Sequence, residues 1–256
     1  MHPILFKIGN FPIYSYGVLM ATAIACALLL GLFRGKKRGF NTDYLIDIAL
    51  YGIIGGLIGA KLLFFIAEMP TIFKDPSSIK YMITEGFVVY GAIIGGAVAA
   101  YIYCRVKNIS FIKHFDLLAP SIALGQGIGR IGCFCAGCCY GSETHNFPFA
   151  VIFKISDYAP NNIPLYPTQL MSSFGNFLIA AALLFFASKK RDDGKVAGLY
   201  MILYSIGRFV IEFLRNDPRG NVGILSTSQF ICIFALVGGI IIYNFDRIIK
   251  SPASHD

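Results

Sequence analysis

Long apolar runs are the feature that most constrains the fold of this chain. An α-helix needs roughly 20 residues to cross about 30 Å of hydrocarbon. Seven stretches of about this length lie at residues 15–33, 46–66, 88–106, 115–133, 166–187, 196–214 and 226–245. Only 14% of the residues are charged, against about 25% in soluble domains. We therefore predict an all-α, polytopic integral membrane protein, with seven transmembrane helices in one membrane domain over residues 1–256.

The basic residues predict the orientation of these helices. Thirteen Lys and Arg residues lie in the segments after the first, third, fifth and seventh runs, and six lie on the other side. Basic loops stay in the cytoplasm, so we expect the amino terminus outside and the carboxyl terminus, with Asp256, in the cytoplasm. We recognise no removable signal peptide at the amino terminus. The net charge of +8 follows from these loops, and we expect no nucleic-acid partner.

Three basic residues fall inside the apolar runs. Arg130 and Arg208 keep their charge in any environment, and each costs at least about 2.5–3.5 kcal/mol at the centre of a membrane helix. Glu212 lies one helical turn after Arg208, so a structural ion pair is one explanation. The other is a cavity in which both arginines bind an anion, and in a bilayer that anion is a lipid phosphate. Lys61 is either a surface anchor whose stem snorkels or a third cation for the same anion.

Four cysteines crowd into "GRIGCFCAGCCYG" at residues 129–141. Cys133, Cys135, Cys138 and Cys139 are spaced C-x-C-x-x-C-C, whereas a structural zinc site usually has two separated pairs of ligands. We therefore expect no metal here. A disulfide on the oxidising side and simple packing of small apolar side chains both stay open.

Glycines and tyrosines also mark the apolar runs. Glycines at 52–60 and 91–100 are spaced for close helix packing. Tyr16, followed by Gly17, and Tyr90, followed by Gly91, each place a hydroxyl at the outer end of a run. An interfacial aromatic belt explains such tyrosines without a catalytic role.

The motif "GRIGCFCAGCCYG" and several others resemble the bacterial prolipoprotein diacylglyceryl transferase family. The signature of that family, G-R-x-G-N-F-x-N-x-E-x-x-G, is matched at Gly129, Arg130, Gly132, Phe134 and Gly141. Further matches are "YG" at 16–17, "GGLIGAKL" at 55–62, "FDLLAP" at 115–120, "NFPF" at 146–149, "YPTQL" at 166–170 and "GRFVIEFLR" at 207–215. The resemblance covers nearly the whole chain in order, and the family also has seven spans.

The departures from the family pattern fall on polar positions. The two signature asparagines are Cys133 and Ala136 here, the signature glutamate is Cys138, and the family histidine before a glycine in the third run is Tyr90. A tyrosine, with a pKa of about 10, is a poorer base than histidine near neutral pH. Three alternatives therefore stay open: Tyr90 acts beside an arginine, the arginines alone stabilise the attacking thiolate, or the acceptor differs.

The resemblance implies an enzyme that moves the diacylglyceryl group of phosphatidylglycerol to the lipobox cysteine of a prolipoprotein. The products are a thioether and glycerol 1-phosphate, and the enzyme is a multi-pass protein of the bacterial cytoplasmic (inner) membrane that needs no cofactor. The runner-up is a phospholipid-binding membrane paralogue with another acceptor or none, whose thiol-rich outer loop serves redox chemistry or assembly. The residues that the resemblance makes catalytic are Arg130, Arg208, Glu212 and Tyr90. Those that it makes lipid- or substrate-binding are Arg130, Tyr16, Gly17, Lys61, Cys133 and Gly141.

The resemblance also bears on the role of the cysteines. The nucleophile belongs to the substrate, and a diacylglyceryl group on an enzyme cysteine would be a thioether, which is a poor leaving group. We therefore expect none of the chain's own cysteines to be the acceptor.

Overall fold

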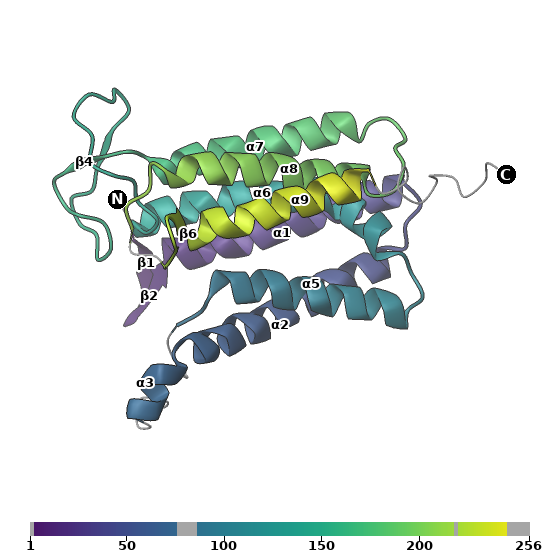
Figure 1. Cartoon of the computed structure of the whole chain (residues 1–256), viewed down its shortest axis with the longest axis horizontal. Coiled ribbons are helices and arrows are strands. Elements are labelled where there is room, and N and C mark those ends of the chain that lie inside the picture. Colours follow the sequence, from purple (N-terminus) through teal and green to yellow (C-terminus); the bar gives the residue numbers. More distant parts are fainter. Residues whose placement is uncertain (1–2, 76–85, 218–219, 245–256) are drawn as a thin grey trace. The chain divides into compact units, whose positions relative to one another are not determined.

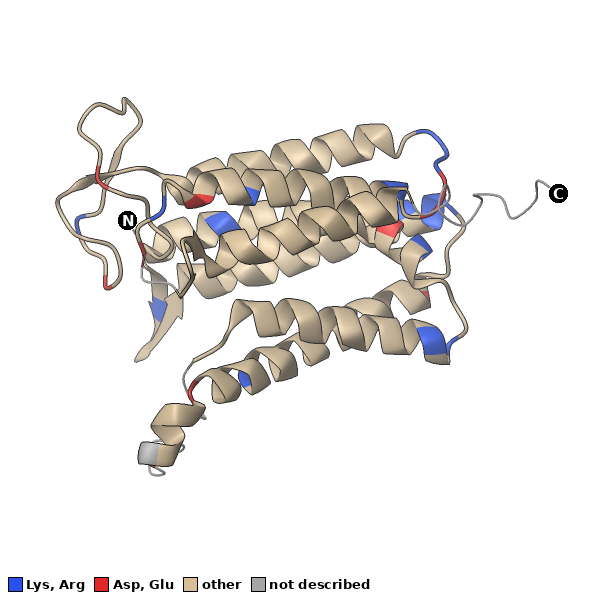
Figure 2. Ribbon diagram, viewed as in Figure 1, with Lys and Arg blue, Asp and Glu red and all other residues tan. Residues whose placement is uncertain are grey.

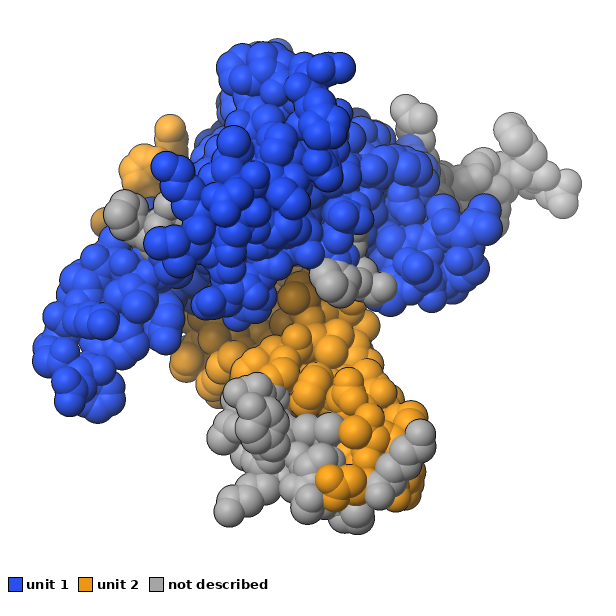
Figure 3. All heavy atoms as spheres, turned by 90° about the vertical axis from the view of Figure 1, so that its left-hand side faces the viewer, with its two compact units in different colours: residues 1–31, 115–256 blue, residues 32–114 orange. Residues whose placement is uncertain are grey.

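The computed structural model describes residues 3–75, 86–217 and 220–244. Within these residues the chain is mostly helical (Figure 1). It divides into two compact units, residues 1–31 with 115–256 (unit 1) and residues 32–114 (unit 2), which Figure 3 colours separately. The long helices are α1 (Ser15–Lys37), α2 (Thr42–Ala67), α5 (Val89–Val106), α6 (Phe111–Ala136), α7 (Thr168–Phe186), α8 (Lys195–Glu212) and α9 (Thr227–Tyr243).

Unit 2 is built on glycine contacts between α2 and α5. A Cβ on Gly59 would overlap the carbonyl oxygen of Gly91, and one on Gly95 would overlap that of Gly55. Only glycine lets the two backbones come this close, which confirms the packing role predicted for these glycines. A short helix, α3 (Met69–Lys74), follows α2.

Unit 1 has its core where α6, α7 and α8 run side by side (Figure 1). Small side chains dominate this core, so that helices can pack closely. Its buried members are Ala119, Ala123, Ala180, Leu183, Ala187, Val196 and Tyr200. The amino-terminal part of α1 covers α6, because a Cβ on Gly125 would touch Ala23 and Ala27.

Two caps fix the starts of α8 and α9. The buried carboxylate of Asp116, on α6, accepts hydrogen bonds of 2.6 Å from the backbone N–H groups of Gly194 and Ala197. It thereby satisfies donors that a helix start leaves unpaired and ties α6 to α8. The start of α9 carries a capping box between Ser226 and Gln229, in which side chain and backbone satisfy each other's donors.

Three short antiparallel hairpins occur among the described residues, and we did not predict them. They pair β1 (Ile4–Ile8) with β2 (Phe11–Tyr14), β3 (Val151–Ile152) with β4 (Pro164–Leu165), and β5 (Asn221–Val222) with β6 (Leu225–Ser226). The second hairpin has a core of its own, formed by Phe153, Ala159 and Leu165. It closes the segment between α6 and α7 at one end of the unit 1 helices (Figure 1).

The seven predicted runs coincide with the seven long helices to within a few residues. In the described part of the chain five of them, α1, α2, α5, α6 and α7, are long and apolar enough to cross a membrane. By contrast, α9 has 17 residues and α8 contains Lys195, Arg208 and Glu212. The prediction of a helical membrane protein is thus confirmed. The count of seven spans and a single membrane domain stay predictions, and Asp256 lies outside the described residues.

Candidate active site

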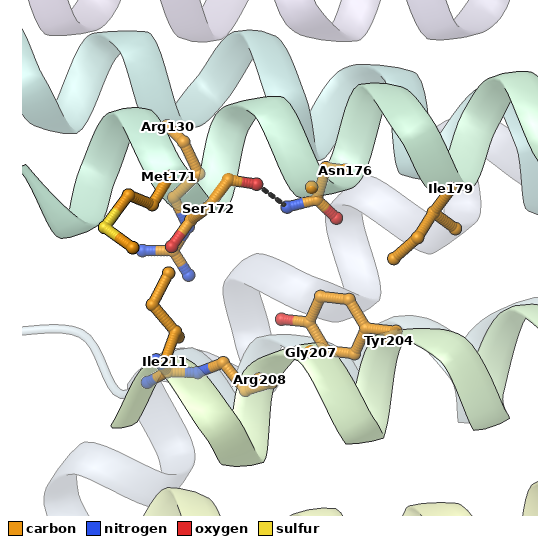
Figure 4. A pocket seen from close by; sticks show the side chains of 10 residues that line it. Arg130, Met171, Ser172, Asn176, Ile179, Tyr204, Gly207, Arg208 and Ile211 are labelled. Carbon is orange, nitrogen blue, oxygen red and sulfur yellow. Dashed lines mark hydrogen bonds between the residues drawn. The ribbon is translucent and has the colours of Figure 1, made fainter. Parts of the chain in front are cut away.

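Arg130 and Arg208 line one pocket. Arg130 reaches it from α6 and Arg208 from α8, while α7 contributes Met171, Ser172 and Asn176 (Figure 4). The space has a volume of about 390 Å³, part of which is open to the surroundings. Two guanidinium groups from separate helices, converging on one space, form a site for an anion because their planar donor forks match phosphate oxygens.

Arg208 is held in place by a carboxylate and a hydroxyl. Its Nη1 lies 2.7 Å from Oε2 of Glu212, whose side chain is 1% exposed, and its Nη2 donates to Oγ of Ser228 at 3.0 Å. Oε1 of Glu212 accepts a hydrogen bond of 2.8 Å from Ser226. Both explanations of Arg208 therefore apply, because it forms the predicted ion pair with Glu212 and also lines the pocket.

Positive charge is in excess around the pocket. Arg215, just past the end of α8, pairs with Asp217 at 2.7 Å and lies 3.9 Å from Glu212. Arg130 forms no ion pair with any acid among the residues that the structure describes. An anion that enters the pocket therefore meets Arg208, which is already paired with Glu212, and Arg130, which has no acidic partner among the described residues.

Tyr204 is a pocket residue that our reading of the sequence did not name. It lies one helical turn before Arg208 on α8, and its hydroxyl points into the space between the helices (Figure 4). It also interacts electrostatically with Arg130. The spacing of four residues from Tyr204 to Arg208 and on to Glu212 puts all three on one helix face, and this signal could have identified it.

Asn176 is a second residue that the sequence did not reveal. Its Nδ2 donates to the carbonyl oxygen of Ser172 at 2.8 Å, so its own Oδ1 is left for another partner (Figure 4). Oδ1 is buried and has no hydrogen-bond partner among the residues that the structure describes, and Asn176 is 6% exposed. A buried acceptor of this kind is costly unless a ligand satisfies it.

The cysteine cluster lies where α6 ends. Sγ atoms of Cys133, Cys138 and Cys139 lie within 4.8 Å of one another, and all seven cysteines are free thiols. Gly137 and Cys139 both have positive φ, at 76° and 59°. These two residues reverse the direction of the chain after α6, so that the thiols of Cys138 and Cys139 approach that of Cys133. Packing of small side chains and a disulfide both stay open here, and three sulfurs this close could also hold a metal.

The thiols of this cluster differ in acidity. Hydrogen bonds from Cys133 and Cys138 lower the pKa of the Cys139 thiol, and the charges of Arg215 and Arg130 lower this pKa further, against the effect of burial. The pKa of Cys138 is raised, because its proton takes part in hydrogen bonds with the other two sulfurs. Cys139 is therefore a more acidic thiol than Cys138.

The other predicted site residues of unit 1 lie around this cluster. Tyr16, which interacts electrostatically with Cys133 and Arg130, packs on Gly132, where a Cβ would lie 3.4 Å from its ring. Gly17 has open space beside it, and Gly141 has none, since a Cβ there would lie 2.5 Å from the carbonyl oxygen of Tyr166. The backbone at Gly141 therefore lies too close to Tyr166 for a side chain to fit.

The remaining predicted residues belong to unit 2. Lys61 donates a hydrogen bond of 3.2 Å to the carbonyl oxygen of Gly86 and lies 4.7 Å from the ring centroid of Phe87. Tyr90 lies in the first turn of α5 and is partly buried. Their roles as third cation and as base stay predictions.

Comparison with known proteins points to one family. The chain matches the family model described as "Prolipoprotein diacylglyceryl transferase" over residues 3–245. It is 49% identical to the phosphatidylglycerol–prolipoprotein diacylglyceryl transferase of Clostridium tetani over 250 residues, 98% of this chain and 100% of that protein. The second transferase of this name from Clostridium perfringens is 48% identical over 249 residues, 97% of this chain and 96% of that protein. The corresponding protein of Finegoldia magna is 31% identical over 243 residues, 94% of each chain.

The motifs identified in the sequence, from residues 16–17 to residues 207–215, all lie within the matched residues 3–245. Arg130 and Arg208, the glycine contacts between α2 and α5, and the β3–β4 hairpin after α6 all lie within these matched residues. On these grounds the chain belongs to the prolipoprotein diacylglyceryl transferase family.

Proposed function

We propose that this protein transfers the diacylglyceryl group of phosphatidylglycerol to the lipobox cysteine thiol of a prolipoprotein and releases glycerol 1-phosphate. The observation that carries this proposal is the convergence of Arg130 and Arg208 on one pocket in a helical membrane protein. Two cations in an apolar protein cost free energy, and a bound lipid phosphate offsets that cost.

The reaction is a displacement at carbon. The substrate thiolate attacks the glycerol carbon of the diacylglyceryl group that carries the phosphate ester. The new bond is C–S, the broken bond is C–O, and the electron pair leaves with the phosphate oxygen. Arg130 and Arg208 neutralise the charge that builds on this oxygen, where preorganised cations act most strongly. The proton of the thiol must leave first, because the thiolate is the nucleophile.

Each predicted residue has a role in this scheme. Glu212 orients Arg208, as their distance of 2.7 Å supports. For Tyr90 the alternatives stay open: its phenolate accepts the proton of the thiol, the arginines alone stabilise the thiolate, or the acceptor differs. In unit 1 the binding surface for lipid and signal peptide comprises Tyr16, Gly17, Cys133 and Gly141, and Lys61, in unit 2, is proposed as a further lipid contact. Asn176 joins this surface, because its buried Oδ1 has no partner and a headgroup hydroxyl of phosphatidylglycerol can donate to it.

The protein works within the bacterial cytoplasmic membrane with seven spans. Support comes from unit 1, where the connection between α7 and α8 contains Lys189, Lys190 and Arg191 (Figure 2). It lies at the opposite end of the helices from the β3–β4 hairpin (Figure 1). The basic connection belongs in the cytoplasm, so the hairpin and the cysteine cluster belong at the outer face.

Complementation tests this function. We expect the chain, expressed in a bacterium depleted of its own transferase, to restore lipid-modified prolipoprotein, as followed by mass spectrometry. Arg130→Ala should abolish the rescue, because about 2.5–4 kcal/mol of charge stabilisation is lost with such a group. The matched control is Arg191→Ala, since Arg191 is exposed. Failure of the wild-type chain at normal expression would favour the non-catalytic paralogue.

A further inference from the structure

We propose that Cys133, Cys138 and Cys139 form a three-thiolate binding site for a soft d¹⁰ metal ion, with Cu(I) as the ion that fits best. The inference concerns the outer end of α6 and does not rest on the transferase activity. It departs from our expectation, drawn from cysteine spacing, that the cluster holds no metal.

The geometry of the three sulfurs carries the proposal. Their Sγ atoms lie within 4.8 Å of one another. Sulfurs bound to one ion at about 2.3 Å lie closer than twice that distance, so small rotations of the side chains complete the site. The cluster comes from one short segment in which Cys138 N–H donates to the carbonyl oxygen of Cys133 at 3.1 Å. The three ligands thus stand on a single, internally bonded turn.

The backbone of this turn is anchored from α7. Nε2 of Gln169 donates to the carbonyl oxygen of Cys138 at 2.8 Å, and Oγ1 of Thr168 donates to that of Cys139 at 2.9 Å. Both anchoring side chains are 1% exposed. Preorganisation of this kind lowers the cost of ordering the ligands when the ion binds.

The charges around the cluster select the ion. Arg130 and Arg215 both act electrostatically on Cys139, so the surroundings favour a complex with negative charge. Three thiolates with Cu(I) carry a net charge of −2, which Arg130 offsets in part, while Arg215 is already paired with Asp217. Binding is a ligand exchange without redox change, in which Cu(I) and three thiols give the tris-thiolate complex and three protons.

The number of ligands also favours Cu(I). Among the described residues no fourth His, Cys, Asp or Glu joins the group. Thiolates bind both zinc and Cu(I), but zinc in structural sites almost always takes four protein ligands, so a set of three thiolates favours Cu(I). The spacing C-x-C-x-x-C-C did not predict a metal site, because an argument from spacing assumes regular backbone. The positive φ angles at Gly137 and Cys139 depart from regular backbone and bring the three thiols together.

A competition experiment tests the site. Purified full-length protein in detergent is titrated, without oxygen, with Cu(I) held by bicinchoninate, and transfer of the ion is read from the loss of the chelator's colour. We expect one Cu(I) per chain. Cys139→Ser and Cys138→Ser should each weaken binding by more than about a hundredfold, since even outer-shell partners contribute 10–100-fold. Cys135→Ser is the matched control, because Cys135 lies in the same motif but outside the group.

Two further readouts separate folding from binding. Thermal unfolding without copper shows whether a variant is folded, and X-ray absorption of the loaded protein should find three sulfur neighbours. Equal weakening by Cys135→Ser, or no transfer from the chelator to wild-type protein, overturns the proposal. So does stoichiometric zinc bound more tightly than Cu(I). A Cys133–Cys139 or Cys133–Cys138 disulfide that persists in reductant also overturns it and assigns the cluster a structural role.

Discussion

Asn176 carries a side-chain carbonyl oxygen that is buried in the pocket wall without a hydrogen-bond partner. We expect Asn176→Leu to raise KM for phosphatidylglycerol roughly tenfold with little change in kcat, because one hydrogen bond to the headgroup is lost in ground and transition state alike. Steady-state kinetics in mixed micelles provide the measurement.

A lipid without the headgroup hydroxyls is the control for Asn176. With phosphatidylethanol as donor, wild type and Asn176→Leu should bind equally well, since neither can form the bond. An equal loss on both lipids would mean that Asn176 only supports the packing of α7.

The lowered pKa of Cys139 predicts selective alkylation in the absence of metal. A lowered pKa keeps the thiolate populated as the pH falls, and a raised pKa keeps Cys138 protonated. At pH 6 we expect iodoacetamide to label Cys139 before Cys138, as read by peptide mass spectrometry. Arg215→Gln should reduce this preference by removing one cation. Equal labelling of Cys138 and Cys139 at pH 6 would contradict the assignment.

At the scale of elements, the glycine contacts between α2 and α5 give a prediction with an internal control. Gly59→Ala should lower the free energy of unfolding by about 1–3 kcal/mol, because a methyl group overlaps the backbone of Gly91 and strains the packing. Gly52→Ala should be neutral or stabilising, because its Cβ would meet only the Gly96 oxygen, at 3.9 Å. Thermal unfolding in detergent distinguishes the two, and similar melting temperatures would contradict the packing role.

The helices were predictable from sequence because apolar length is a strong signal, and each long helix lies within a few residues of its predicted run. The hairpins were not, since strands of two residues such as Val151–Ile152 have no periodicity to detect. The arginines of the pocket were predictable from the cost of buried charge. Asn176 was not, because an amide inside an apolar run resembles any other polar residue that packs against a neighbouring helix.

For the whole molecule, the testable property is its orientation in the membrane. Reporter fusions inserted after Lys190, in the basic connection between α7 and α8, should report the cytoplasm. Fusions inserted after Tyr158, in the segment that leads to β4, should report the outside. The two sites flank α7, which is apolar enough to cross the membrane. The reverse result, with the fusion after Lys190 outside and the fusion after Tyr158 in the cytoplasm, would refute the orientation, and the same compartment for both would show that α7 does not cross the membrane.

The carboxylate of Asp116, which caps the start of α8, has a consequence for the synthesis of the chain. When α6 leaves the ribosome, about 80 residues separate Asp116 from its two N–H donors (at roughly 5–20 residues per second, several seconds of synthesis). Until residues 194–197 arrive, the membrane holds a helix with an unsatisfied acid. We expect a chain truncated in α7 to lack both hydrogen bonds for good, so that Asp116 never gains the partners that it has in the finished molecule.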